Sequence, residues 1–156
     1  MACKVIGMRV VDTREYVSVL RELTEQGKEV SMVIAGSSMS PFLIHGRDVI
    51  CFKKPERKPR KGDMVFFQRT SGQYVMHRIW KKSEEGYYIV GDAQKDIEGP
   101  ILEAQIFAII TKVKRKDKWI TPGDFWWEFF EHVWINIIPI LWIFVKGYAL
   151  LSRLKK

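Results

Sequence analysis

Short apolar runs separated by turn-forming residues constrain the fold of this chain more than any other feature. Runs of about four to eight residues rich in Val, Ile, Phe and Tyr are typical of strands, whereas helices need longer periodic segments. The stretches that fit are Glu29–Ala35, Val49–Phe52, Asp63–Gln68, Gln73–Trp80, Tyr87–Val90 and Ile106–Val113. Thr70, Ser71 and Gly72 separate two of these runs and predict a β-hairpin. The pattern therefore predicts a mainly antiparallel β domain.

One helix is expected before the strands, over Thr13–Gln26. Val17, Leu20 and Leu23 give it an apolar stripe, and Gly27 follows its end, which is a common stop signal for helices. We therefore expect an α+β fold, mainly β, in which an N-terminal helical segment (1–28) precedes a β domain (29–120) and a C-terminal segment (121–156). The chain has 156 residues, 47% of them hydrophobic, which is enough to bury a core.

The C-terminal segment combines aromatic, apolar and basic residues. Four of the six tryptophans lie between Phe125 and Leu151. The mostly apolar stretch Val133–Val145 is about 13 residues long, short of the ~20 needed for a helix that crosses a bilayer. Aromatic and basic residues together are typical of helices that lie in a membrane interface, so we expect an interfacial helix. The alternatives are a helix packed on its own domain or on a second copy, and a tilted or kinked span starting near Phe125.

The charge of the chain favours an anionic partner. Its 26 basic and 18 acidic residues give a net charge of +8, which suits an anionic membrane surface or nucleic acid. Six basic residues lie in Lys53–Gly62, a loop that is either solvated or in contact with anionic headgroups. No recognition motif for DNA is found, so no specific nucleic acid is expected. Residues 1–9 lack the apolar core of a signal peptide, and we expect a peripheral, membrane-associated protein on the cytoplasmic side.

The two cysteines predict no metal site. Cys3 and Cys51 show neither CxxC nor Cys/His spacing, so neither a disulfide framework nor a zinc site is expected. No cofactor is expected either.

The run Ala35–Leu43 is the best candidate for chemistry. It is rich in small and hydroxylated residues and follows an apolar, strand-like segment. A serine here, Ser38, needs a base to become a nucleophile, and His77 in a later expected strand is the best partner. Asp92, in a turn after another expected strand, could orient the histidine. The three side chains would supply the nucleophile, base and carboxylate of a serine hydrolase.

The local sequences around these residues resemble those of a known enzyme family. They are Gly36-Ser37-Ser38-Met39-Ser40-Pro41, Lys61-Gly62-Asp63-Met64-Val65-Phe66-Phe67, Val75-Met76-His77-Arg78-Ile79 and Gly91-Asp92. They occur in the order of the conserved boxes of type I signal peptidases, and the chain resembles that serine-protease superfamily over roughly residues 30–113. The superfamily also includes self-cleaving repressor proteins. The His77-Arg78 pair is similar to the archaeal and endoplasmic-reticulum branch, in which histidine replaces a lysine base.

The resemblance implies roles for individual residues. Ser38 would be the nucleophile, His77 the base and Asp92 the orienter of His77, with Asp96 as the alternative. The residues implied in oxyanion or substrate binding are Gly36, Ser37, Met39, Tyr74, Val75 and Met76, and the oxyanion would chiefly meet the main-chain N–H of Ser38. The family usually carries a membrane span before its serine box, whereas this chain has the expected helix there.

The expected activity is cleavage of a peptide or precursor protein with small side chains before the cut. The substrate would lie extended between Val33–Gly36 and Tyr74–Met76 as an added strand. A histidine base predicts that activity falls below a pH of about 6 to 7. The alternative functions are a self-cleaving regulator, and a membrane or nucleic-acid binding module without catalysis.

Overall fold

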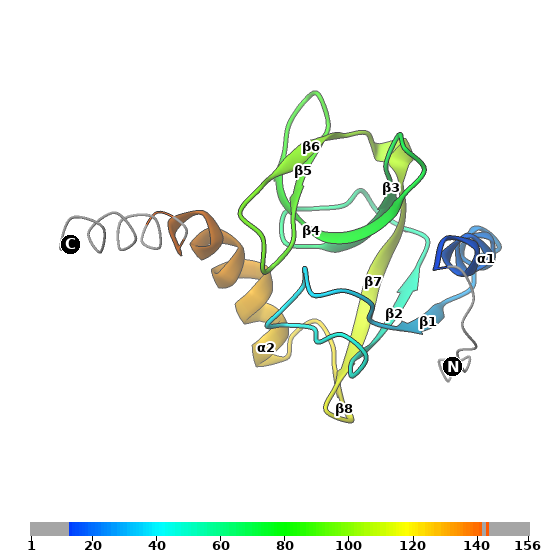
Figure 1. Ribbon diagram of the computed structural model, residues 1–156, viewed down its shortest axis with the longest axis horizontal. Coiled ribbons are helices and arrows are strands. Elements are labelled where there is room, and N and C mark those ends of the chain that lie inside the picture. Colours follow the sequence, from blue (N-terminus) through cyan, green and yellow to red (C-terminus); the bar gives the residue numbers. More distant parts are fainter. Residues whose placement is uncertain (1–12, 142, 144–156) are drawn as a thin grey trace, which may run out of the picture.

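The computed structural model describes residues 13–141 and 143 (Figure 1). In chain order, its elements are α1 (Thr13–Glu25), β1 (Val30–Val33), β2 (Val49–Lys53), β3 (Met64–Gln68), β4 (Tyr74–Lys82), β5 (Tyr87–Val90), β6 (Glu98–Ile101), a 3-10 turn (Glu103–Gln105), β7 (Ile106–Arg115), β8 (Lys118–Ile120) and α2 (Phe125–Glu128). The helix and the six strands expected from the sequence are all present. The strands β6 and β8 were not expected.

The strands form one sheet in the order β1-β2-β7-β3-β4-β5-β6, and β8 pairs with β7. Every pair is antiparallel, and α1 and α2 lie at opposite sides of it (Figure 1). The expected α+β, mainly β fold is therefore confirmed. The expected hairpin is present too, because β3 and β4 pair from Met64 with Arg78 to Gln68 with Tyr74.

The run Met64–Phe67 has no polar alternation because β3 is covered on both faces. Met64 and Phe66 belong to the largest apolar core of the described residues, which also contains the buried stripe of α1. Val65 and Phe67 point the other way, into a second core formed with β4, β5, β6 and β7. Successive residues of a strand point to opposite faces, so the same alternation continues on the neighbouring strand β4.

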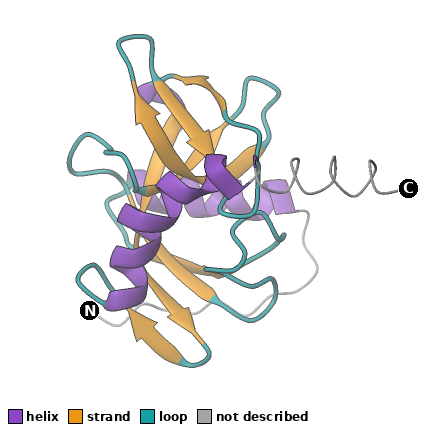
Figure 2. Ribbon diagram, turned by 90° about the vertical axis from the view of Figure 1, so that its left-hand side faces the viewer, coloured by secondary structure: helices purple, strands orange, loops and turns teal. Residues whose placement is uncertain are grey.

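The C-terminal helix packs on its own domain. α2 continues as a π-helical segment over Phe129–Trp134 and as helix over residues 135–141, along one side of the sheet (Figure 2). Trp127, Phe130, Ile135 and Ile138 are buried, which agrees with the packing alternative, while other apolar side chains of the helix are exposed. No helix within the described residues combines the length and apolarity that crossing a membrane requires. Trp142 and the terminal basic residues lie outside the described part.

Cys51 corrects one expectation. Its side chain is wholly buried in β2, and it is disulfide-bonded, whereas the cysteine spacing predicts no disulfide framework. Cys3 lies outside the described residues.

Candidate active site

The loop that carries Ser38 is held in place by buried side chains on its far side. Met39, Phe42 and Leu43 are at most 2% exposed, and the Leu43 N–H donates to the Met39 carbonyl at 2.9 Å. The fully buried carboxylate of Asp48 closes the loop by accepting from the Ile44 N–H at 2.9 Å. The apolar residues after Ser38 therefore anchor the turn in the core and leave the serine itself half-buried.

His77 comes from β4. It lies opposite Val65 in the β3 register, and its ring is 6.3 Å from that of Phe67, centroid to centroid. The side chain is only 4% exposed, and no described group forms a hydrogen bond with Nδ1. Burial lowers the pKa of His77 from 6.5 to about 4, so the ring is neutral at pH 7.

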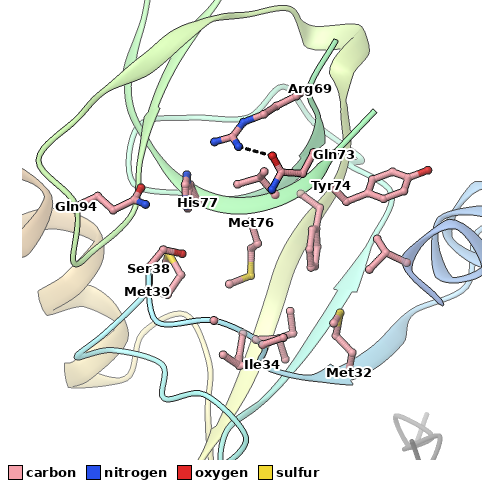
Figure 3. A pocket seen from close by; sticks show the side chains of 16 residues that line it. Met32, Ile34, Ser38, Met39, Arg69, Gln73, Tyr74, Met76, His77 and Gln94 are labelled. Carbon is pink, nitrogen blue, oxygen red and sulfur yellow. Dashed lines mark hydrogen bonds between the residues drawn. The ribbon is translucent and has the colours of Figure 1, made fainter. Parts of the chain in front are cut away.

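Ser38 and His77 line one cavity of about 300 Å³, called the Ser38 cavity below. Figure 3 shows Ser38 on its loop below β4, with His77 on that strand and Gln94 beside them. The apolar part of the lining includes Met32, Ile34, Met39, Phe66, Tyr74 and Met76. No hydrogen bond joins Ser38 Oγ to His77 in the described structure. The two groups thus share a cavity without being hydrogen-bonded to each other.

Gly91 and Ala93 connect the serine loop to the end of β5. The Ala93 N–H donates to the Ser38 carbonyl at 2.8 Å. A Cβ at Gly91 would lie 2.6 Å from that same carbonyl oxygen, a distance that real side chains do not reach. Glycine is therefore required where the turn approaches the serine loop. This steric requirement explains the glycine of the Gly-Asp box.

Asp92 does not orient His77, contrary to the prediction. Both of its carboxylate oxygens accept from Arg78, from Nε at 2.8 Å and from Nη2 at 2.9 Å. Arg78 also donates from Nη1 to the Gly62 carbonyl at 2.8 Å, and both charged side chains are almost fully buried. Complete burial raises the pKa of the Asp92 carboxyl, and the Arg78 charge opposes that shift. The reason for the wrong prediction is that Arg78 and His77 point to opposite faces of β4, and Asp92 lies on the Arg78 side.

The residues of the Arg78–Asp92 ion pair also contact the Lys61-Gly62-Asp63 box and the C-terminal helix. A Cβ at Gly62, whose φ is +92°, would lie 2.5 Å from Glu131 Cγ, so this turn also needs glycine. Trp134 Nε1 donates to the main-chain carbonyl of Asp92 at 3.0 Å. Three of the four sequence boxes therefore meet around one buried guanidinium.

Asp96 does not reach the Ser38 cavity either. It is exposed and lines a neighbouring hollow beside Arg69. The carboxylate whose charge affects the pKa of His77 is that of Glu98. It raises the pKa and so partly offsets the effect of burial, whereas the charge of Arg69 lowers the pKa. Glu98 is itself bound by Arg69 through two hydrogen bonds of 2.6 Å.

The sequence reasoning missed three polar residues of the Ser38 cavity, Arg69, Gln73 and Gln94. Arg69 and Gln73 flank the turn of the expected hairpin, and Nη1 of the arginine donates to Oε1 of the glutamine at 2.6 Å. Gln94 belongs to the Gly91 turn, because its N–H donates to the Gly91 carbonyl at 2.9 Å. Each lies two residues from a sequence box, and this nearness was the signal that could have identified them.

The expected oxyanion and substrate-binding residues divide into two groups. Gly36, Met39, Tyr74, Val75 and Met76 line the Ser38 cavity, whereas the exposed Ser37 does not. The Gly36 N–H donates to His45 Nδ1 at 2.9 Å and is therefore not available to a substrate. No described group accepts a hydrogen bond from the main-chain N–H of Ser38, which leaves that donor available for an oxyanion.

One group of described side chains has the composition of a metal site. The ligand atoms of Glu128, Glu131 and His132 lie within 4.8 Å of one another on the C-terminal helix. His132 Nε2 is already 3.1 Å from a Glu128 oxygen, and Glu131 accepts from Trp127 Nε1 at 2.7 Å. None of the three lines the Ser38 cavity, so they take no part in its chemistry.

Comparison with protein-family models, with curated proteins and with solved structures finds no match. The resemblance to type I signal peptidases rests on the sequence boxes and stays a prediction.

Proposed function

We propose that this protein is a signal-peptidase-like serine endopeptidase that cleaves a peptide bond in a precursor protein. The observation that carries the proposal is that Ser38 and His77, from separate sequence boxes, line the same cavity. The His77 ring is neutral at pH 7 because its pKa is about 4, and a neutral ring can accept the serine proton.

In the proposed reaction, the His77 ring turns so that a ring nitrogen reaches Ser38 Oγ when the substrate binds. His77 takes the proton, Oγ attacks the scissile carbonyl, and the main-chain N–H of Ser38 donates to the oxyanion. The protonated ring then gives its proton to the leaving amine. Water hydrolyses the acyl-enzyme in a second step with the same base.

Two strand edges support binding of an extended peptide beside the serine. β1 pairs with β2 alone, and β5 pairs with β4 only from Arg78 onward. The edge of residues 74–77 that faces away from β3 therefore has no strand partner in the described structure. Unpaired main-chain groups of this kind bind peptides as an added strand, and the small residues Ala35 and Gly36 leave room for it.

We also propose that the protein associates peripherally with anionic membranes through its C-terminal helix. Phe125, Trp126, Ile140 and Ile143 are 71%, 50%, 51% and 69% exposed. Exposed aromatic and aliphatic side chains along one helix are typical of interfacial binding, and the net charge of +8 favours an anionic surface.

A cleavage assay on candidate precursor peptides tests the peptidase proposal. Ser38→Ala and His77→Ala should each lower kcat/KM by at least about a thousandfold, because nucleophile and base act as a unit. Ser37→Ala is the matched control, since its exposed hydroxyl does not line the cavity, and it should retain activity. Circular dichroism checks that each variant is folded. Undiminished cleavage by either folded variant would remove the mechanism.

A further inference from the structure

A second cavity, of about 580 Å³, lies between the β7–β8 hairpin and the start of α2. Four basic side chains line it, from Arg47, Arg115, Lys116 and Lys118. The lining contains one carboxylate, Asp124, which accepts from the main-chain N–H and the hydroxyl of Thr121. The cavity therefore carries an excess of positive charge. We call it the basic aromatic pocket.

Three of the four cations form no ion pair with a carboxylate among the described residues. Arg47 is paired at 2.7 Å with the buried carboxylate of Asp48. Lys116 and Lys118 are exposed, and neither forms an ion pair with a described residue. Arg115 donates from Nη2 to the Pro41 carbonyl at 3.4 Å, while its Nε is buried, with no hydrogen-bond partner among the described groups. A buried, unpartnered donor of a charged group is costly, which marks a place where an acceptor would be stabilising.

Aromatic side chains pack against Arg115 and line the pocket. The Arg115 guanidinium lies 5.1 Å from the Phe42 ring centroid and 5.6 Å from that of Trp126. The other aromatic residues of the lining are Trp119 and Phe125, which are 41% and 71% exposed. Charged groups beside exposed aromatic side chains suit a ligand that is anionic at one end and apolar at the other.

The hairpin turn explains how the two lysines reach the pocket. Lys116 and Asp117 have φ values of +46° and +65°, as in the two-residue turns that match the twist of paired strands. Lys118 follows at the start of β8, and its charge lowers the pKa of the Asp124 carboxyl less than the hydrogen bonds from Thr121 do. The turn thus presents two cations beside the first residues of α2.

We infer that the basic aromatic pocket binds the headgroup of an anionic phospholipid, with the phosphate against Arg115, Lys116 and Lys118. The rings of Phe125 and Trp126 then lie in the membrane interface. The helix also exposes the apolar side chains of Trp126, Val133 and Ile140. A nucleic acid would leave these apolar side chains in water, whereas a membrane covers them. The choice of a lipid headgroup as the ligand rests on the proposed membrane association, whereas the binding of that headgroup in the pocket is tested separately from vesicle binding and from the peptidase activity.

Vesicle sedimentation with the full chain tests the inference. The protein should sediment with vesicles of phosphatidylcholine and phosphatidylglycerol, and not with vesicles of phosphatidylcholine alone. Reversing two charges in the pocket, with Lys116→Glu and Lys118→Glu, should weaken binding at least about tenfold, since each lysine near the surface contributes about 1 kcal/mol. The matched control reverses two exposed lysines of the basic loop, with Lys54→Glu and Lys58→Glu, and should change binding less than about twofold. Equal losses in the two double variants overturn the inference.

A soluble short-chain phosphatidylglycerol separates the pocket from the membrane. Below its micelle concentration it should shift the NMR signals of Lys116, Lys118 and Trp119 in the wild-type protein, a readout that needs no variant. If these signals shift but no vesicles are bound, the membrane proposal fails and the pocket inference stands. If they do not shift, the inference is overturned.

A DNA duplex that bound as tightly, with the same loss in the pocket variant, would also overturn it. Ser38→Ala should bind vesicles like the wild type.

Discussion

Burial sets the proton affinity of His77 more than any charge near it. The sequence predicts an activity loss below a pH of about 6 to 7, the ordinary range for histidine, but the pKa in the structure is about 4. A base is active when unprotonated, so kcat/KM should hold as the pH falls through 6.5 and decline about tenfold per unit only below the lowered pKa. A pH profile of kcat/KM checks this. A decline that begins near pH 6.5 would show that the ring is hydrated in the free enzyme.

Gly91 sets the position of Ser38 through steric contact alone. Gly91→Ala would place a Cβ 2.6 Å from the Ser38 carbonyl oxygen, so the serine loop must move. A displacement of about 1 Å at a catalytic group costs on the order of a hundredfold in rate, and we expect that loss in kcat/KM with the fold retained. Ala93→Ser is the control, because it keeps the N–H that binds Ser38 and adds only an exposed hydroxyl. Equal activity of the two variants would contradict the steric role.

Between elements, the Arg78–Asp92 pair joins β4 to the turn after β5. Removing one partner of a buried ion pair costs about 3 to 5 kcal/mol, because the other charge is left uncompensated. Asp92→Asn should therefore lower the free energy of unfolding by that amount in urea titrations followed by tryptophan fluorescence. Glu25→Gln, in the exposed pair with Arg21, should cost less than about 0.5 kcal/mol. A loss in Asp92→Asn as small as that of the control would mean that the pair adds no stability.

The Arg78–Asp92 ion pair also shows which part of the site could not be predicted from the sequence. The motifs placed Ser38 and His77 correctly on a loop and on a strand, and the apolar runs located six strands. They did not reveal which of two consecutive residues, His77 or Arg78, shares a face with Asp92, because that depends on the register of β3 with β4 and on the turn after β5. Sequence spacing gives alternation along a strand but not the side from which a distant turn approaches.

The two missed strands have local reasons. β6 contains Gly99 and Pro100, which are unfavourable in strands and are tolerated here because β6 is the last strand in the sheet order. β8 has three residues and follows a turn whose positive φ values fall on Lys116 and Asp117. Neither the usual glycine nor asparagine marks that turn, so its sequence carries no hairpin signal.

At the scale of the whole molecule, the C-terminal helix has two apolar sides with different environments. Ile135 is fully buried against Val90 and Ile138, whereas Ile140 is 51% exposed. The first side holds the helix on the domain, and the second is available to a membrane. The same substitution on the two sides should therefore separate folding from membrane binding.

Ile135→Ala should lower the free energy of unfolding by about 2 to 5 kcal/mol, because it leaves a cavity in a packed core. Ile140→Ala should change that free energy by less than about 0.5 kcal/mol and weaken binding to phosphatidylglycerol vesicles severalfold, since each methylene withdrawn from the interface costs about 0.8 kcal/mol. Urea unfolding and vesicle sedimentation measure the two effects on the same samples. If Ile140→Ala destabilised the fold as much as Ile135→Ala, the second side would be an internal packing surface. If it left vesicle binding unchanged, the helix would not enter the interface at this position, and contact would be confined to the aromatic residues at its start.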